Sequence, residues 1–169
     1  LQPILPTGNQ RGFTLLEILC CLFIIGLMVG VVSLSLPNDR ENDPQTKAAE
    51  LRRALLMAQE NAVFKSRDYG LLLTGKQYRF YRYQPSGWVE ETDDPLLSHG
   101  RLPDGLSMSL TIESQPVDLI KADQPQVLIL SDGQLSEFTI EFSARQRKEK
   151  VRLSGSFDGA LQITADSPS

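Results

Sequence analysis

The chain has 169 residues, of which 41% are hydrophobic and 22% charged, and its formal net charge is −4. This length predicts about one globular domain, and the composition excludes disordered and collagen-like proteins. The negative balance gives no reason to expect a nucleic acid or an anionic membrane surface as the partner of the whole chain.

An apolar segment over residues 13–36 is the first predicted element. Glu17 is its one charged residue. As a helix that rises ~1.5 Å per residue, the segment would reach ~36 Å, enough to cross a bilayer core of ~30 Å. Arg11 precedes the segment and mainly acidic residues follow it. We therefore predict a transmembrane helix, with residues 1–12 in the cytoplasm and the rest of the chain outside.

Glu17 is unusual in such a segment. A carboxylate near the middle of a membrane costs roughly 2.5–3.5 kcal/mol on insertion scales, and less near a helix end. Either the side chain snorkels to the interface, or a cationic partner compensates it. The residues Arg11-Gly12-Phe13-Thr14-Leu15-Leu16-Glu17 resemble the type IV prepilin processing motif, in which a glycine, an N-methylated residue and a glutamate four residues later open a long apolar helix.

The resemblance implies how the N-terminus matures. In that family a membrane-embedded aspartyl prepilin peptidase cuts after the glycine and methylates the new amine. Here this implies cleavage between Gly12 and Phe13 and N-methylation of Phe13, with residues 1–12 as a leader. It also implies that Glu17 compensates the cationic amine of Phe13 during assembly, because two charges that are costly to bury alone are tolerable together.

Two glycines and two cysteines also lie in the apolar segment. Gly26 and Gly30 have the GxxxG spacing, which lets helices approach closely. We favour close packing in a filament core over a dedicated dimer motif. Cys20 and Cys21 are adjacent, so on a helix their side chains point about 100° apart and cannot bridge each other. With no further cysteine, a disulfide framework is excluded.

Residues 37–66 predict a linker and an amphipathic helix. Pro37 interrupts the first helix, and Asp43 is the predicted N-cap of the second, with Pro44 at its first position. Alternating spacings of three and four residues then give one apolar stripe that we expect to pack on the following domain. The stripe consists of Ala48, Leu51, Leu55, Ala58 and Ala62.

Residues 67–169 carry short strand-like segments separated by turn residues such as Gly75, Asp132-Gly133 and Asp158-Gly159. The predicted strands are residues 69–74, 77–84, 106–112, 127–130, 138–142, 151–154 and 160–164. The predicted fold class is therefore α+β and pilin-like. A long N-terminal transmembrane helix is followed by a β-rich head of about seven to eight antiparallel strands, in two packed sheets.

Within the head, scattered short segments resemble the H-type minor pseudopilin of type II secretion. They are Arg67-Asp68-Tyr69-Gly70, Trp88, Arg101-Leu102-Pro103-Asp104-Gly105, the segment 125–133 and Phe138. The resemblance implies a structural subunit near the tip of a periplasmic pseudopilus anchored in the bacterial inner membrane. The implied partners are prepilin peptidase, the other minor pseudopilins, the major pseudopilin and the inner membrane, with secreted substrates as a further candidate.

Motifs for chemistry are missing from the sequence. It contains no P-loop, GxSxG, HExxH or CxxC motif. The single histidine, His99, lies in a predicted loop, where a solvated role is favoured over a functional one. Ser131-Asp132-Gly133 is interpreted as a turn rather than a nucleophile site. We expect no enzymatic activity, no cofactor and no metal site.

A basic cluster near the C-terminus leaves alternatives open. Its members are Arg145, Arg147, Lys148, Lys150 and Arg152. The favoured interpretation is a solvated hairpin loop; the alternative is a contact with an acidic neighbour or with DNA. The rival functions are accordingly a minor pilin of a type IV pilus or DNA-uptake system, and a membrane-anchored periplasmic binding domain. Since the head is net acidic, we expect no nucleic-acid partner.

Overall fold

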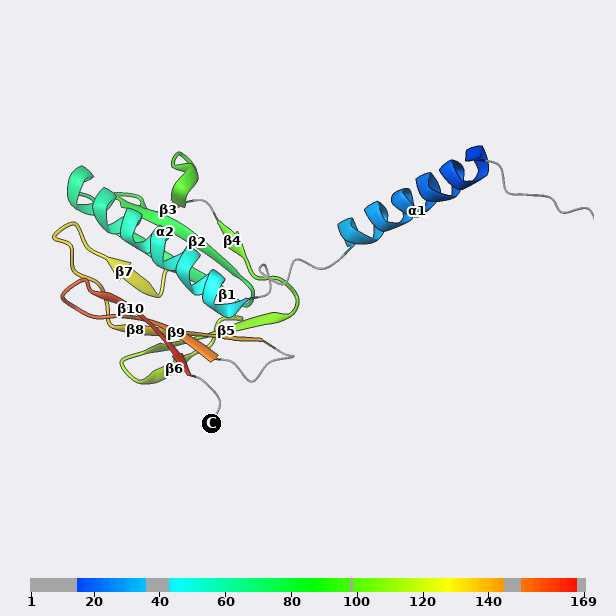
Figure 1. Cartoon of the computed structure of the whole chain (residues 1–169). Coiled ribbons are helices and arrows are strands. Elements are labelled where there is room, and N and C mark those ends of the chain that lie inside the picture. Colours follow the sequence, from blue (N-terminus) through cyan, green and yellow to red (C-terminus); the bar gives the residue numbers. More distant parts are fainter. Residues whose placement is uncertain (1–14, 36–42, 98, 145–149, 167–169) are drawn as a thin grey trace, which may run out of the picture. The chain divides into compact units, whose positions relative to one another are not determined.

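A computed structural model of the chain describes residues 15–35, 43–97, 99–144 and 150–166, without the side chains of 29–35 and 166 (Figure 1). The chain forms two compact units, Leu1–Asn38 and Asp39–Ser169. The described part of the first is the helix α1 (Leu15–Ser35). The second is the head, which contains a helix and two sheets.

The head begins with helix α2 (Pro44–Lys65), and its start follows from local capping. The carboxylate of Asp43 accepts hydrogen bonds from the backbone N–H groups of Gln45 and Thr46 at 3.3 and 3.2 Å. These are N–H groups that no helical carbonyl can reach. Ser66 ends the helix in the left-handed conformation, with φ 46°. The predicted cap at Asp43 and the predicted start at Pro44 are confirmed.

Ten strands of the described residues form two antiparallel sheets. The first sheet has the order β3-β2-β1-β7, and β4 also pairs with β2. Its strands are β1 (Tyr69–Thr74), β2 (Gln77–Gln84), β3 (Gly87–Glu90), β4 (Gly100–Arg101) and β7 (Val127–Ile129). The second sheet has the order β10-β9-β8-β5-β6. Its strands are β5 (Leu106–Ile112), β6 (Gln115–Val117), β8 (Phe138–Ala144), β9 (Lys150–Gly155) and β10 (Leu161–Asp166).

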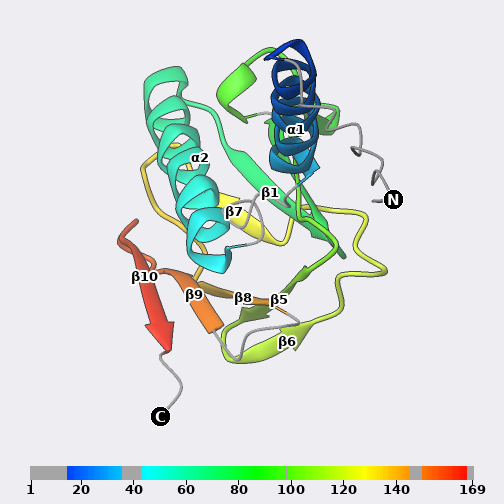
Figure 2. The same ribbon diagram turned by 45° about the vertical axis from the view of Figure 1, so that its right-hand side comes forward.

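The core lies where α2 meets both sheets (Figures 1 and 2), and α2 contacts β1 and β7 of one sheet and β8, β9 and β10 of the other. The predicted apolar stripe of α2 is fully buried, at 0% exposure for each of its five residues. The period-two pattern works as expected in β5, where Leu106, Met108 and Leu110 are buried while the serines between them are exposed. Phe80, Phe138 and Phe142 are among the largest side chains in this core.

The α+β class, the antiparallel pairing and the two packed sheets are confirmed. The prediction of seven to eight strands falls short of the ten observed because β3, β4 and β6 are only four, two and three residues long. Such short segments carry too little alternation to be distinguished from loop sequence. The seven predicted strands correspond to β1, β2, β5, β7, β8, β9 and β10.

Candidate assembly surfaces

The predicted processing site lies at the start of the first unit. Gly12 and Phe13 fall outside the described residues, so cleavage between them and methylation of Phe13 stay predictions. Glu17 lies in the first turn of α1, where the partial positive charge of the helix N-terminus favours a carboxylate. The compensation of the Phe13 amine by Glu17 likewise stays a prediction.

Over its described side chains, residues 15–28, helix α1 is apolar on every side. From Leu15 to Met28 each described residue is exposed within this unit, including Leu22 at 64% and Phe23 at 66%. A helix that is apolar all round is buried against something other than water. Gly26 has open space around it, and Gly30 is in the same helix, so the predicted close packing at these glycines stays a prediction. Among the described residues, no helix meets the length and apolarity needed to span a membrane.

The short segments that resemble minor pseudopilins come together in the head as packing residues. A Cβ on Gly70 would lie 2.5 Å from Cβ of Pro125 and 3.1 Å from Cζ3 of Trp88. Glycine is therefore required here because the proline and the indole lie directly against the strand. Asp68, the residue before β1, accepts a hydrogen bond from the backbone N–H of Ser131 at 2.8 Å. These residues fix the fold and do not form a reactive site.

The turn that contains Ser131 is built as its residue types predict. The side chain of Asp132 accepts a hydrogen bond from the backbone N–H of Gln134 at 3.0 Å. Gly133 has φ +90°, a conformation that favours glycine. Its N–H bonds the carbonyl of Leu130 at 3.0 Å, which closes the turn. The interpretation of residues 131–133 as a turn is confirmed.

The basic cluster is only partly described, since Arg145, Arg147 and Lys148 fall outside the described residues. The hairpin that contains the cluster is present, because β8 pairs with β9. Lys150 Nζ lies 2.8 Å from Glu141 Oε1, and Arg152 Nε lies 3.3 Å from Glu141 Oε2. The hydrogen bond from Lys150, followed by its charge and by Arg152, lowers the pKa of Glu141. Both described cations of the cluster thus form ion pairs with Glu141, which lies on the neighbouring strand of the same sheet.

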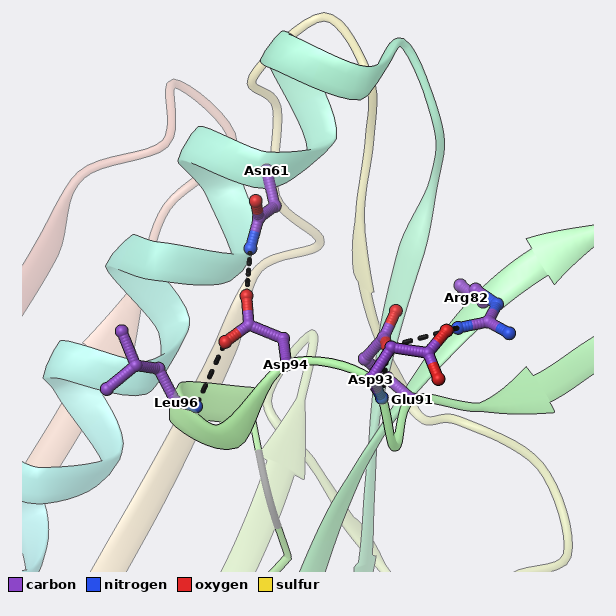
Figure 3. Close-up of polar contacts among 6 residues, drawn as sticks. All are labelled: Asn61, Arg82, Glu91, Asp93, Asp94 and Leu96. Carbon is purple, nitrogen blue, oxygen red and sulfur yellow. Dashed lines mark hydrogen bonds and ion pairs between the residues drawn. The ribbon is translucent and has the colours of Figure 1, made fainter.

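An ion-pair cluster that sequence analysis missed lies after β3 (Figure 3). The Nη1 atom of Arg82 lies 3.0 Å from Glu91 Oε1 and 2.8 Å from Asp93 Oδ2. The Glu91 side chain is only 3% exposed, so Arg82 supplies the positive charge that makes its burial tolerable. The hydrogen bonds to Asp93 and Glu91 raise the pKa of Arg82. The acidic run from residue 90 to 94 was the available signal, but it did not reveal a partner on β2.

The same segment is tied to α2 by a second contact in Figure 3. The side-chain amide of Asn61 donates to Asp94 Oδ2 at 2.9 Å, and Asp94 Oδ1 accepts from the backbone N–H of Leu96 at 3.0 Å. Leu96 lies in the short 3-10 helix η1 (Pro95–Leu97) and is 63% exposed, whereas Leu97 is fully buried. The polar contacts thus hold residues 91–97 against α2 and position Leu97 in the core.

His99 follows this segment and is exposed. It lines a shallow depression beside α2 with Glu50, Arg53, Met57, Tyr78 and Leu96. Burial, followed by the charge of Glu50, raises the pKa of Tyr78. The depression holds no second histidine, and no group of three metal-binding side chains gathers anywhere in the described part of the chain.

An apolar surface remains at the C-terminal end of α2. It is a shallow depression lined by Leu56, Gln59, Glu60, Val63, Phe64 and Gly159. Phe64 is 88% exposed and Val63 52% exposed. The predicted stripe of α2 did not include the helical residues of this lining because they fall outside its spacing of three and four residues. Large apolar side chains gathered at a surface are typical of protein contact sites.

Two family models match the chain. The prokaryotic N-terminal methylation motif covers residues 7–33, and the type II transport protein GspH covers residues 47–159. The chain belongs to the GspH family. Among its relatives, type II secretion system protein H of Pseudomonas aeruginosa is 33% identical over 165 residues, which cover 89% of this chain and 92% of the relative. The protein of the same name from Aeromonas hydrophila is 31% identical and covers 85% of each.

Solved structures of the family share the fold. A crystal structure of the minor pseudopilin EpsH of Vibrio cholerae matches with a TM-score of 0.64 at 22% identity, over 75% of this chain and 96% of the other. The solution structure of Escherichia coli GspH matches with a TM-score of 0.57 at 26% identity, over 69% and 84%. The predicted assignment is confirmed: the chain is a GspH-type minor pseudopilin of type II secretion with an N-terminal methylation motif. This family is structural, so the prediction that the chain is not an enzyme is also confirmed.

Proposed function

We propose that this GspH-family chain is a structural subunit assembled near the tip of the periplasmic pseudopilus that drives type II protein secretion. The observation that carries the proposal is the contrast between its two units. The head buries its own apolar stripe and forms a complete core, whereas α1 exposes apolar side chains on all sides. A chain built in this way has a self-sufficient head and a helix whose burial must come from other molecules.

Under this proposal, residues 13–36 anchor the subunit in the inner membrane as a single pass, with residues 1–12 cytoplasmic and the head periplasmic. Prepilin peptidase removes residues 1–12 and methylates Phe13. The apolar sequence, the methylation motif and the charge asymmetry around Arg11 support this placement. On assembly the segment leaves the lipid and packs in the filament core, where Gly26 and Gly30 allow neighbouring helices to approach closely.

Glu17 has a specific part in that assembly. Its carboxylate compensates the amine of Phe13, within one subunit or between neighbours, when both enter the filament core. The partners are then the other minor pseudopilins and the major pseudopilin, with secreted substrates meeting the heads. DNA is not a partner in this proposal, because 16 Lys and Arg against 20 Asp and Glu follow Pro37. A minor pilin that takes up DNA would need a basic surface.

The substitution Glu17→Ala tests this role. Membrane insertion should be intact or improved, because a charge is removed from an apolar segment. Crosslinking to the other pseudopilins and secretion should both fall, because the amine of Phe13 would enter the filament core uncompensated. The matched control is Glu50→Ala, which removes an exposed carboxylate from α2 and should leave both unchanged. Normal secretion and unchanged crosslinks in Glu17→Ala would show that the carboxylate has no part in assembly.

A further inference from the structure

The edges of the two sheets differ in how well they are protected against pairing with another chain. At one edge of the first sheet, the segment that follows the turn at residues 131–133 covers β7. Leu128 N–H donates to Ser136 Oγ at 2.8 Å, and its carbonyl accepts from Ser136 N–H at 3.0 Å. On the other side of that sheet, β3 and β4 are four and two residues long. In the second sheet, β6 has three residues, and Pro116 lacks an N–H.

The fourth edge, β10, is the least protected in the described part of the head. It is six residues long, contains no proline, and carries no charged residue before Asp166. Among the described strands it pairs only with β9, and Figure 2 shows it in red at the margin of its sheet. Long, uncharged edge strands are the ones that accept another strand. Natural proteins usually protect such edges, so an unprotected one indicates that another extended strand pairs with it.

The ladder with β9 defines which backbone groups of β10 face outward. Ser156 N–H donates to the carbonyl of Ala160, so the backbone N–H and C=O groups of residue 160 face the β9 side. Because this direction alternates along an antiparallel pair, the backbone groups of residues 161, 163 and 165 face away from β9. The Leu161 carbonyl is already used, because it accepts a hydrogen bond from Arg52 Nε at 3.3 Å. Ile163 and Ala165 therefore present two N–H and two carbonyl groups at the edge.

We propose that β10 is a dimerisation edge, on which β10 of a second copy of this chain pairs antiparallel with Thr164 facing Thr164. This register joins Ile163 of each copy to Ala165 of the other and forms four backbone hydrogen bonds. A register centred on Ile163 would need the Leu161 carbonyl, which Arg52 holds. The bond from Arg52 thus selects one register among those that the edge allows.

The second copy is the occupant because β10 complements itself. Leu161 and Ile163 lie on the side of the strand that packs toward the core, whereas Gln162 and Thr164 are exposed on the other side. A twofold axis perpendicular to the sheet keeps the apolar sides together, so each half-buried Ile163 gains apolar cover. It also pairs Thr164 with Thr164, a favourable cross-strand pair. Copies held in one membrane or micelle meet at a high effective concentration, which compensates for a small interface.

Disulfide crosslinking tests the register directly. The full chain with Cys20→Ala and Cys21→Ala is reconstituted in liposomes, and Thr164→Cys is added. Directly opposed residues in a non-hydrogen-bonded pair have Cα atoms about 4.5 Å apart, within the range that a disulfide bridges. Mild oxidation should therefore give a covalent dimer. The matched control is Gln162→Cys on the same exposed side, which would face residue 166 of the other copy and should give none.

A second variant separates strand pairing from chance encounter. In the Thr164→Cys background, Ala165→Pro removes an outward N–H that β9 does not use, so the sheet should stay folded while the dimer is lost. Ala165→Ser should leave the dimer intact. Equal crosslinking of Thr164→Cys and Gln162→Cys, or a dimer that survives Ala165→Pro, would overturn the proposal. So would a crosslink in cells to a different pseudopilin with none to the chain itself. These outcomes are independent of whether Glu17 acts in assembly.

Discussion

The two long helices of the chain have nearly the same length but differ in how their apolar side chains are distributed and buried. Helix α1 has 21 residues and α2 has 22. In α2 the five residues of the predicted stripe are buried at 0% exposure, whereas the apolar residues described in α1 lie all round the helix and are exposed. The difference is that α2 is buried within its own unit, whereas the described side chains of α1 find no burial within theirs. Under the proposed function, α2 therefore serves folding of the head and α1 serves assembly.

The largest effect should come from matched leucine substitutions in the two helices. Leu55→Ala removes a fully buried side chain of α2 and should lower the free energy of unfolding of the head by about 2–5 kcal/mol. Leu22→Ala, made in α1 where the side chain is 64% exposed, should leave the unfolding of the head unchanged. Denaturant titration of the detergent-solubilised chain, followed by the fluorescence of Trp88, would measure both. A similar loss of unfolding free energy in the two variants would show that the head depends on both helices alike.

A smaller effect is expected from the ion-pair cluster that fixes the segment beside α2. Arg82→Met would leave Glu91 buried without its cation, so the melting temperature should fall, though by less than in Leu55→Ala. Arg79→Met is the matched control on the same strand, because the Arg79–Glu90 pair is 3.4 Å long and well exposed. Circular dichroism melts would compare them. If the two methionine variants melt alike, the cluster is not needed to hold residues 91–97.

The smallest effect concerns Glu141 and pH. Lys150 and Arg152 lower the pKa of Glu141 from the ordinary value of 4.5. Its contribution to the stability of the folded head is therefore complete above about pH 4.5. It is lost as the pH falls through the lower pKa of the folded state. Glu141→Gln should therefore reduce stability at neutral pH, by no more than about 1 kcal/mol, and the difference from the unsubstituted chain should shrink in acid. A difference that grows below pH 4.5 would contradict the assigned pKa.

The sequence predicted those features whose signals are local. Asp43 and Pro44 marked the start of α2 because a cap and a first-turn proline act within four residues, and the stripe through Leu55 followed from spacing alone. The alternation of Leu106, Met108 and Leu110 predicted β5 for the same reason.

Features that depend on strand register could not be predicted. Arg82 and Glu91 meet only because β2 and β3 pair with Arg82 opposite Val89, and nothing in a single sequence gives that register. The close approach of Pro125 and Trp88 to Gly70 likewise joins three distant segments. The edge formed by β10 becomes visible only once the order of the sheet is known. At the N-terminus the situation is reversed, since Gly12, Phe13 and Glu17 form a local motif that sequence alone could recognise.

The N-terminal motif also offers the most direct test of the central claim, that α1 belongs to a processed subunit and not to a permanent anchor. The full chain should be expressed in cells with an active prepilin peptidase, extracted from the membrane and analysed by mass spectrometry. We expect a mature chain that begins at Phe13 and carries one N-methyl group, and a Gly12 substitution that blocks cleavage should leave residues 1–12 attached. An unmethylated terminus at any other position, in the presence of active peptidase, would show that the chain is not processed as a prepilin.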